Sequence, residues 1–420
     1  MDRIIIQGGK PLSGKTTVSG AKNSALAIMA ATLLSEGTHT IAHMPMLRDI
    51  MTMRRLMEHF GAEITGKAEM VFNTDSIDVH EAPYELVKTM RASFLVLGPL
   101  LARFGSARVS LPGGCAIGVR PVDQHIKAFE AMGASIIIEN GYVNATCEKL
   151  QGTHINFDMP TVGGTENIMM AACLAEGQTI IENAAREPEI VDLAQALRSM
   201  GAVIKGDGTA VMTIQGVSRL RPLTYTVMPD RIEAGTLMVA VGMAGGEIEI
   251  DNCPVDAMGS TIEKLREAGL VITEQDKTLT VSRTGSIRPL EITTNPFPGF
   301  PTDMQAQFMA LLTMADGTSI IKETIFENRF IHVAELDRMG ARIKVDHDSA
   351  VVVGIEQLQG ASVMASDLRA SASLIIAGLG AVGETSVSRV YHLDRGYEQL
   401  EIKLQGLGAS IRREKENQGI

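Results

Sequence analysis

Six short segments of similar sequence follow one another along this chain at a nearly constant interval. They are LMEHFGAEI, FEAMGASI, LRSMGAVI, LREAGLVI, LDRMGARI and LQGLGASI, with their shared glycines at Gly61, Gly133, Gly201, Gly269, Gly340 and Gly408. Successive glycines lie 72, 68, 68, 71 and 68 residues apart, and so steady a period is typical of a repeated structural unit. Each segment predicts a helix that ends at a glycine and is followed by an apolar strand.

A second series of glycines precedes the first, and each of its members closes an apolar segment such as ALAIMAATLLSEG. These glycines are Gly37, Gly105, Gly177, Gly246, Gly317 and Gly383. The apolar segments have helical length, and the residues after them have strand character. Each repeat is therefore predicted to run strand, helix, strand, helix, strand, with a further hairpin strand, which indicates an α/β architecture.

The last repeat ends soon after GASIRRE and lacks its final strand. The N-terminal segment RIIIQGGKPLSGKTTVSG has two strand-like runs and no helical pattern. We therefore expect this segment to complete the last repeat and to tie the two ends of the chain together.

Composition excludes several classes of protein. The 38 basic and 49 acidic residues give a net charge of −11, which disfavours general binding to nucleic acid or to an anionic membrane. The four cysteines are far apart and form no CxxC pair, which argues against a zinc ribbon and suits a reducing compartment. The apolar runs are too short for a secretory signal or a membrane span. We expect a soluble, cytoplasmic protein.

The second repeat contains an insertion. The spacing from the first to the second glycine series is 24, 28, 24, 23, 23 and 25 residues in the six repeats. The extra residues of the second repeat fall in LPGGCAIGVRPVDQH, residues 111–125, where Cys115 is flanked by glycines. Glycines let a ligand approach the backbone, and Arg120 can stabilise a thiolate or an anionic substrate. The segment is typical of an active-site loop, although an inert buried thiol in a turn is the alternative.

Charged residues recur at equivalent places in the repeats. The turn before the second helix carries an arginine in every repeat except the fourth: Arg48, Arg120, Arg186, Arg329 and Arg395. The starts of the first helices are also polar, with Lys22, Asn23, Arg91, Thr161, Thr165, Asp230, Arg231, Asp303, Asp367 and Arg369. Cations at helix starts are favourable when they share an anionic ligand. The pattern predicts an anion site, with scattered surface ion pairs as the alternative.

One motif in the sequence matches a known pattern in an unsuitable context. Residues 9–16, GKPLSGKT, fit the phosphate-binding loop pattern G-x-x-x-x-G-K-[ST]. That loop requires a helix beginning at its lysine, whereas the β-branched run TTVSG follows here. We interpret the segment as the turn of a hairpin that joins RIIIQ to TTVSG.

Several motifs together resemble one enzyme family. GAKNSAL, GGCAIGVRPVDQH, TVGGTENIMMAA, FPTDMQAQ, ENRF, HVAEL, DLRASASLIIAGL and HLDRGYE resemble the UDP-N-acetylglucosamine 1-carboxyvinyltransferases, the UDP-N-acetylglucosamine enolpyruvyl transferases of bacterial peptidoglycan synthesis. The resemblance implies two inside-out α/β barrel domains, each of three repeated βαβαββ-type units. The domains would be residues 21–229, carrying the Cys115 loop, and residues 1–20 plus 230–420.

The resemblance also implies a reaction in which phosphoenolpyruvate and UDP-N-acetylglucosamine give the 3-O-enolpyruvyl sugar nucleotide and phosphate. Cys115 would be the general acid for C3 of phosphoenolpyruvate and the target of the epoxide fosfomycin. Asp303 would accept the proton of the sugar 3-hydroxyl. Lys22, Arg120 and Arg395 would hold the phosphate and carboxylate of phosphoenolpyruvate.

The same resemblance implies a second set of residues, in contact with the sugar nucleotide. It comprises Asn23, Arg91, Arg120, Pro121, Val122, Asp123, Gln124, Thr161, Val162, Gly163, Ile325 and Arg329, with Asp367 and Arg369 in the same cleft. The family usually has alanine and leucine where this chain has Val119 and Gln124. The resemblance implies no metal or other cofactor and indicates no protein partner.

Three other functions compete with this one. 5-Enolpyruvylshikimate-3-phosphate synthase shares the fold and the type of reaction but lacks the GGCAIG insertion. The phosphate-binding loop pattern would suggest an ATPase or kinase, against the context above. A non-catalytic scaffold of six repeats would leave the cysteine loop and the recurring arginines without a role.

Overall fold

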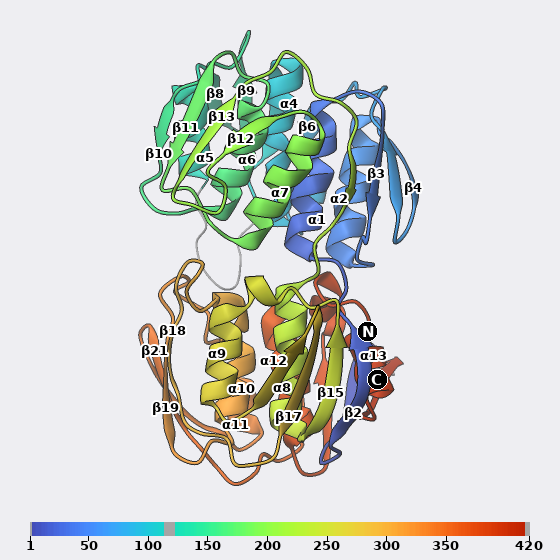
Figure 1. The fold of residues 1–420 in the computed structure, drawn as a ribbon, viewed down its shortest axis with the longest axis vertical. Helices are drawn as coiled ribbons and strands as arrows, with labels where there is room; N and C mark the ends of the chain where they lie inside the picture. The colour runs from blue at the N-terminus through green and yellow to red at the C-terminus, as the bar shows by residue number, and fades with distance from the viewer. Residues whose placement is uncertain (1, 113–121, 416–420) are drawn as a thin grey trace. The chain divides into compact units, whose positions relative to one another are not determined.

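The computed structural model describes residues 2–112 and 122–415 of the chain. These residues form two compact lobes (Figure 1). The first lobe comprises residues 20–112 and 122–228, and the second comprises residues 2–19 and 229–415. Cys115, Val119, Arg120 and Pro121 lie outside the described residues.

Each lobe contains three four-stranded sheets of the same topology. In the first lobe, the first sheet has the spatial order β14 (Thr224–Thr226), β3 (Thr38–Ala42), β5 (Met70–Asn73) and β4 (Glu63–Gly66). The second sheet has the order β6 (Glu81–Ala82), β7 (Ser106–Ser110), β9 (Tyr142–Thr146) and β8 (Ser135–Glu139). The third sheet has the order β10 (His154–Asn156), β11 (Gln178–Glu182), β13 (Val211–Gln215) and β12 (Val203–Lys205). The first two strands of each sheet are parallel and the other pairs are antiparallel.

The second lobe repeats this arrangement. Its first sheet has the order β2 (Leu12–Thr17), β15 (Gly246–Asp251), β17 (Thr278–Arg283) and β16 (Val271–Gln275). Its second sheet has the order β18 (Glu291–Thr293), β19 (Thr318–Lys322), β21 (Ser349–Val353) and β20 (Arg342–Asp346). Its third sheet has the order β22 (Ser362–Met364), β23 (Glu384–Ser388), β1 (Asp2–Gln7) and β24 (Ser410–Lys415). The six sheets confirm the six repeats predicted from the glycine spacing.

The helices of each repeat form two classes. The first helices are α1 (Lys22–Ala31), α4 (Leu97–Phe104), α6 (Val162–Ala172), α8 (Arg231–Ala244), α10 (Gln305–Leu312) and α12 (Leu368–Gly380). The second helices are α2 (Arg48–Phe60), α5 (Asp123–Ala131), α7 (Pro188–Ser199), α9 (Gly259–Glu267), α11 (Val333–Arg338) and α13 (Leu400–Gly406). Shorter pieces are α3 (Tyr84–Val87) and the 3₁₀ helices η1 (Thr32–Leu34), η2 (Arg91–Val96), η3 (Val255–Ala257), η4 (Thr302–Met304) and η5 (Val390–Arg395).

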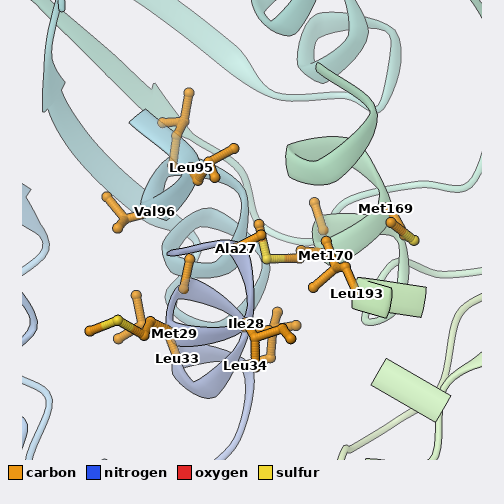
Figure 2. Packing of buried hydrophobic residues seen from close by; sticks show 14 of the residues in the cluster. Ala27, Ile28, Met29, Leu33, Leu34, Leu95, Val96, Met169, Met170 and Leu193 are labelled. Atoms are coloured by element: carbon orange, nitrogen blue, oxygen red, sulfur yellow. The ribbon is translucent and has the colours of Figure 1, made fainter. Parts of the chain in front are cut away.

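The first helices form the centre of each lobe. Every residue of α10 and nearly every residue of α8 and α12 is buried, whereas a strand such as β19 alternates buried and exposed residues. A helix that is buried on all sides is surrounded by other elements. The first lobe has the same kind of centre: Figure 2 shows Ile28 of α1, Leu95 of η2 and Met170 of α6, which belong to its cluster of buried hydrophobic residues. Helices inside and sheets outside match the predicted inside-out barrels.

The two glycine series have the conformation expected of helix ends. Every member of both series has a positive φ, for example 109° at Gly61 and 72° at Gly105. Residues with side chains rarely adopt this left-handed conformation, so glycine is favoured where a helix turns into the next strand. The repeat that was visible in the sequence is therefore a repeat of backbone geometry.

The N-terminal segment serves two sheets. β1 lies between β23 and β24 and pairs antiparallel with both, which confirms that the N-terminus completes the last repeat. β2 pairs with β15 in a different sheet, so the predicted hairpin between RIIIQ and TTVSG is wrong. An unpaired strand edge is unfavourable, and β2 covers the edge of β15 just as β14 covers the edge of β3. The sequence contained no signal for this choice of partner.

The phosphate-binding loop pattern lies in extended chain. Gly14 and Lys15 belong to β2, and the next helix begins at Lys22. Lys15 forms exposed ion pairs with Glu249 and Asp251 of the neighbouring strand. A phosphate cradle needs the N–H groups of a helix start, which this segment does not offer. Within the described residues, no helix is long and apolar enough to cross a membrane.

The contribution of β1 to stability can be tested with Ile6→Ala. The Ile6 side chain is fully buried, and its Cδ1 atom lies against Gly378 of α12. Removing it should lower the free energy of unfolding by about 2–5 kcal/mol, because the transfer energy is lost and a cavity remains. Urea denaturation measures the change. Ile137→Ala is the matched control, since Ile137 is 59% exposed, and its effect should stay within about 0.5 kcal/mol. Equal losses in the two variants would contradict the predicted role of β1.

Candidate active site

In the second lobe, an aspartate is held between two arginines. Asp303 lies in η4, immediately before α10. Arg329 donates from Nη2 to its Oδ1 at 2.7 Å, and Arg369 donates from Nη2 to its Oδ2 at 2.7 Å. Both arginine side chains are 5% exposed and that of Asp303 is 29% exposed. The three residues come from three segments, so only the tertiary structure brings them together.

The electrostatics of this group keep Asp303 ionised. Burial by itself would raise its pKa, but the charges of Arg369 and Arg329 and their hydrogen bonds outweigh burial and hold the pKa well below its ordinary value. For Arg369, burial disfavours the charge, yet Asp303 foremost raises its pKa. Charge-assisted hydrogen bonds of this length are among the strongest in proteins. At neutral pH the site thus offers an ionised carboxylate whose side chain is partly exposed.

Asp367 and Arg395 lie near the start of the same helix, α12. Asp367 caps α12, because its Oδ1 accepts hydrogen bonds from the backbone N–H groups of Arg369 and Ala370. Arg395 ends η5, and a Cβ on the next residue, Gly396, would lie 2.6 Å from Leu368 Cδ2. This close packing places Arg395 beside the start of α12. The starts of α10 and α12 and the end of η5 thus share one region.

A buried glutamate that the sequence analysis missed organises the Ile325 turn. Glu323 is 3% exposed, and its Oε1 accepts hydrogen bonds from the N–H groups of Ile325 and Phe326 at 2.9 and 3.3 Å. Its Oε2 accepts from Thr302 Oγ1 at 2.8 Å, and the same hydroxyl accepts from Arg329 Nη1 at 3.1 Å. Glu323 therefore links the Ile325 turn to the neighbourhood of Asp303. Its position shortly before the conspicuous ENRF motif was the available signal.

In the first lobe, Lys22 begins α1 and pairs with the first turn of α2. Its Nζ lies 3.4 Å from Asp49 Oδ2, and the side chains are 12% and 6% exposed. Asn23 is exposed at the same helix start. Asp49, which directly follows Arg48, was not among the predicted residues. Its place in the recurrent turn before a second helix was the signal.

Arg91 begins η2 and acts on a buried histidine. Burial first, and then the charge of Arg91, lowers the pKa of His125 to about 3. Asn167 donates from Nδ2 to His125 Nδ1 at 3.2 Å and to the carbonyl of Phe94 at 3.1 Å, while its Oδ1 accepts from the N–H of Gly98 at 2.7 Å. Because the amide is the donor, Nδ1 is the acceptor and Nε2 carries the proton. His125 and Asn167 were also missed.

The two predicted nucleotide-contacting runs lie close to each other. Thr161 caps α6 with its hydroxyl, which accepts from the N–H of Gly164 at 3.3 Å. A Cβ on Gly163 would lie 3.5 Å from His125 Cε1, so the turn passes directly over the imidazole. Gln124 Oε1 accepts from the N–H of Met159 at 3.5 Å. The segments 122–124 and 161–163 are thereby neighbours, and Val162 and Asp123 are exposed there.

The predicted site residues therefore divide by lobe. Asp303, Ile325, Arg329, Asp367, Arg369 and Arg395 gather in the second lobe, and Lys22, Asn23, Arg91, Val122, Asp123, Gln124, Thr161, Val162 and Gly163 belong to the first. Cys115, Arg120 and Pro121 lie outside the described residues. The second lobe by itself offers clustered cations and an ionised carboxylate, which suit chemistry on phosphorylated or carboxylated substrates.

Comparisons with known proteins find one matching family model and relatives that are similar over the whole chain. The matching family model is described as EPSP synthase (3-phosphoshikimate 1-carboxyvinyltransferase) and covers residues 6–404. The UDP-N-acetylglucosamine 1-carboxyvinyltransferase of Geotalea daltonii is 56% identical over 417 residues, which cover 99% of this chain and 100% of that protein. The enzyme of the same name from Nitratidesulfovibrio vulgaris is 57% identical over 419 residues, covering 99% and 100%.

Solved structures with the same fold are more distant in sequence. The enolpyruvyl transferase NikO from Streptomyces tendae superposes with a TM-score of 0.89 at 26% identity and covers 98% of both chains. EPSP synthase from Acinetobacter baumannii has a TM-score of 0.77 at 19% identity, covering 99% of this chain and 100% of that one. The latter similarity concerns the fold alone.

The buried His125 should make stability depend on pH. Its pKa is about 6.5 when unfolded and about 3 in the fold, so its contribution is complete above pH 6.5 and is lost as the pH falls. At pH 5 the loss from this residue should be about 2 kcal/mol. Any destabilisation by His125→Gln should therefore shrink by that amount between pH 7 and pH 5, measured by urea denaturation. A constant difference for His125→Gln would contradict the prediction.

Proposed function

The chain belongs to the UDP-N-acetylglucosamine 1-carboxyvinyltransferase family, and we propose that it transfers the enolpyruvyl group of phosphoenolpyruvate to the 3-hydroxyl of UDP-N-acetylglucosamine and releases phosphate. This reaction is an early step of peptidoglycan and cell-wall synthesis. The structural observation that supports it best is the Asp303 carboxylate between Arg329 and Arg369. A reaction between a sugar hydroxyl and an anionic enol ester needs a proton acceptor next to fixed cations.

Asp303 suits the role of proton acceptor, although its paired carboxylate is a weak base. The hydroxyl proton becomes strongly acidic only as its oxygen bonds to C2 of phosphoenolpyruvate. A carboxylate that stays ionised can take the proton at that moment, and its two guanidinium partners fix its orientation. The partial exposure of Asp303 leaves a face for the hydroxyl.

In the proposed reaction, addition of the sugar hydroxyl to phosphoenolpyruvate is followed by elimination of phosphate. The Cys115 thiol gives its proton to C3 of phosphoenolpyruvate while the sugar 3-hydroxyl oxygen bonds to C2, and Asp303 receives the hydroxyl proton. In the elimination, C3 returns a proton to the thiolate and the bond from C2 to the phosphate oxygen breaks. The departing phosphate takes up the proton that came from the hydroxyl. Lys22, Arg120 and Arg395 would stabilise the phosphate and carboxylate charges.

The remaining site residues would bind the sugar nucleotide. They are Asn23, Arg91, Arg120, Pro121, Val122, Asp123, Gln124, Thr161, Val162, Gly163, Ile325 and Arg329, with Asp367 and Arg369 beside Asp303. The proximity of Gln124 to Met159 and of His125 to Gly163 supports a common role for the two runs of the first lobe. We also propose that the functional domains are residues 21–229 and residues 1–20 with 230–420, and that the enzyme acts in the cytoplasm.

The function can be tested by measuring phosphate release with and without UDP-N-acetylglucosamine. Release of phosphate from phosphoenolpyruvate should require UDP-N-acetylglucosamine, and Asp303→Asn should lower kcat by about 10²–10⁴-fold, the range of general acid–base catalysis.

Cys115→Ser should lose turnover at every pH, whereas Cys115→Asp should remain active and escape alkylation by fosfomycin. Release of phosphate with shikimate 3-phosphate in place of the sugar nucleotide would instead support the sister activity. Full turnover of Cys115→Ser would refute the general-acid role.

The phosphate-binding loop pattern yields a further test. Lys15 lies in β2 and contacts Asp251 and Glu249 on the neighbouring strand, so Lys15→Ala should keep the wild-type kcat. Steady-state phosphate release measures it, with Lys10→Ala, in the same N-terminal segment, as a matched surface control. A collapse of turnover in a Lys15→Ala protein with normal thermal unfolding would revive a nucleotide-hydrolase or kinase function.

A further inference from the structure

A buried polar network lies under the Asp303 site in the second lobe. It consists of Thr236 of α8, Gln307 of α10 and Tyr397, which follows η5, and we call it the Tyr397 network. Tyr397 is 2% exposed, and Thr236 and Gln307 are 1% and 0% exposed. The Tyr397 hydroxyl lies 2.9 Å from Thr236 Oγ1 and accepts from Gln307 Nε2 at 3.1 Å. Neither the proposed proton transfers nor the substrate contacts assign these residues a role.

The hydrogen bonds of this network have a defined direction. Thr236 Oγ1 donates its single proton to the carbonyl of Ile232 at 2.7 Å. A hydroxyl has one proton to donate, so Thr236 must accept the proton of Tyr397. Gln307 Nε2 also donates to the backbone carbonyl of Asp303 at 2.9 Å. Because the Tyr397 proton goes to Thr236, the Tyr397 oxygen can only accept from Gln307 and from any further donor.

The network contacts the catalytic group from two sides. The central carbon of the Arg369 guanidinium lies 5.4 Å from the centroid of the Tyr397 ring, a distance at which a cation is attracted to an aromatic face. Arg369 in turn donates to Asp303 Oδ2. Gln307 holds the Asp303 backbone and Tyr397 holds the arginine on the Asp303 side chain. The same network therefore sets both the main chain and the carboxylate of one residue.

We propose that Tyr397 is a positioning residue for the transferase reaction, which holds the Arg369 guanidinium against Asp303 so that the carboxylate is presented in one orientation to the sugar hydroxyl. The inference rests on the proposed function of Asp303. Tyr397 follows Arg395 by two residues, and Gly396 between them packs on Leu368 at the start of α12. The segment 395–397 therefore contributes a phosphate-binding cation and the support of the proton acceptor.

The charges around Asp303 and Arg369 determine how a change at Tyr397 would alter the pH dependence of activity. Arg329 and Arg369 face Asp303, while Asp303, Tyr397 and Asp230, the N-cap of α8, act on Arg369. If the hold on Arg369 is weakened, the depressed pKa of Asp303 should rise toward its ordinary value. The ionised form is the active one, so activity is lost as the pH falls through this pKa. The acid limb of the activity profile should then move to higher pH.

Tyr397→Phe tests the inference, because it keeps the ring but removes the hydroxyl, and the hydrogen bonds of that hydroxyl with Thr236, Gln307 and Arg369 hold the ring and the guanidinium together. In the phosphate-release assay, kcat should fall by about 10-fold, equivalent to one misplaced charge-assisted contact, while KM for UDP-N-acetylglucosamine changes less than about 3-fold. The acid limb of kcat/KM should shift to higher pH. Thr236→Val, which removes the acceptor of the Tyr397 proton, should act in the same direction. Tyr225→Phe is the matched control, because it removes a hydroxyl bonded to Asp192 at 2.7 Å in the first lobe and should leave kcat and the profile unchanged.

A measurement independent of turnover separates this inference from the proposed function. Carboxyl ¹³C resonances of labelled aspartate, with Asp303 assigned from Asp303→Asn, should titrate at higher pH in Tyr397→Phe than in wild type. An active wild type whose Tyr397→Phe variant keeps kcat, acid limb and titration would overturn the positioning role alone. A wild type without dependent phosphate release would overturn the function, and the titration would still decide for or against the contact. Thermal unfolding checks that each variant is folded.

Discussion

A helix that is buried on every side can meet polar ligands only at its ends. The first helices of the second lobe, α8, α10 and α12, satisfy this description, because nearly all of their side chains are buried. Their surroundings exclude water from the helix sides, so charge is tolerated where the N-terminal N–H groups need acceptors. Asp230 and Asp367 cap two of these helices, and Asp303 lies in the turn that leads into the third. The interior of the barrel thus determines where polar chemistry can occur.

Charges in such a region must be paired, and the pairs determine the chemistry. The Asp303 carboxylate is stabilised by two guanidinium groups that are themselves almost fully buried. Removing one partner from a buried ion pair leaves an uncompensated charge. The arginines therefore determine the protonation state of Asp303, because their charges and hydrogen bonds outweigh the effect of burial on its pKa. The Tyr397 network lies next to Arg369, which donates to Asp303. An arginine can orient a carboxylate only if the arginine is itself held in place.

Closure of each lobe depends on strands that come from a distant part of the chain. β14 completes the first sheet of the first lobe, while β1 and β2 complete two sheets of the second. The periodicity predicted that the N-terminus completes the last repeat, because that repeat visibly lacked a strand. It could not show that β2 would pair with β15 rather than with β1. Both partners offer the same backbone hydrogen bonds, and only the positions of the sheets in the folded chain distinguish them.

The sequence by itself determined the six repeats, the order of elements within each, the two glycine series and the helix ends where polar residues gather. These features depend on local backbone conformation and on hydrophobic periodicity, which are properties of short segments. The tertiary structure alone decided that Asp303 pairs with Arg329 and Arg369, that Glu323 accepts a hydrogen bond from Thr302 and that His125 is buried near the charge of Arg91. Each of these contacts joins residues of different segments, and its strength depends on burial, which no short stretch of sequence specifies.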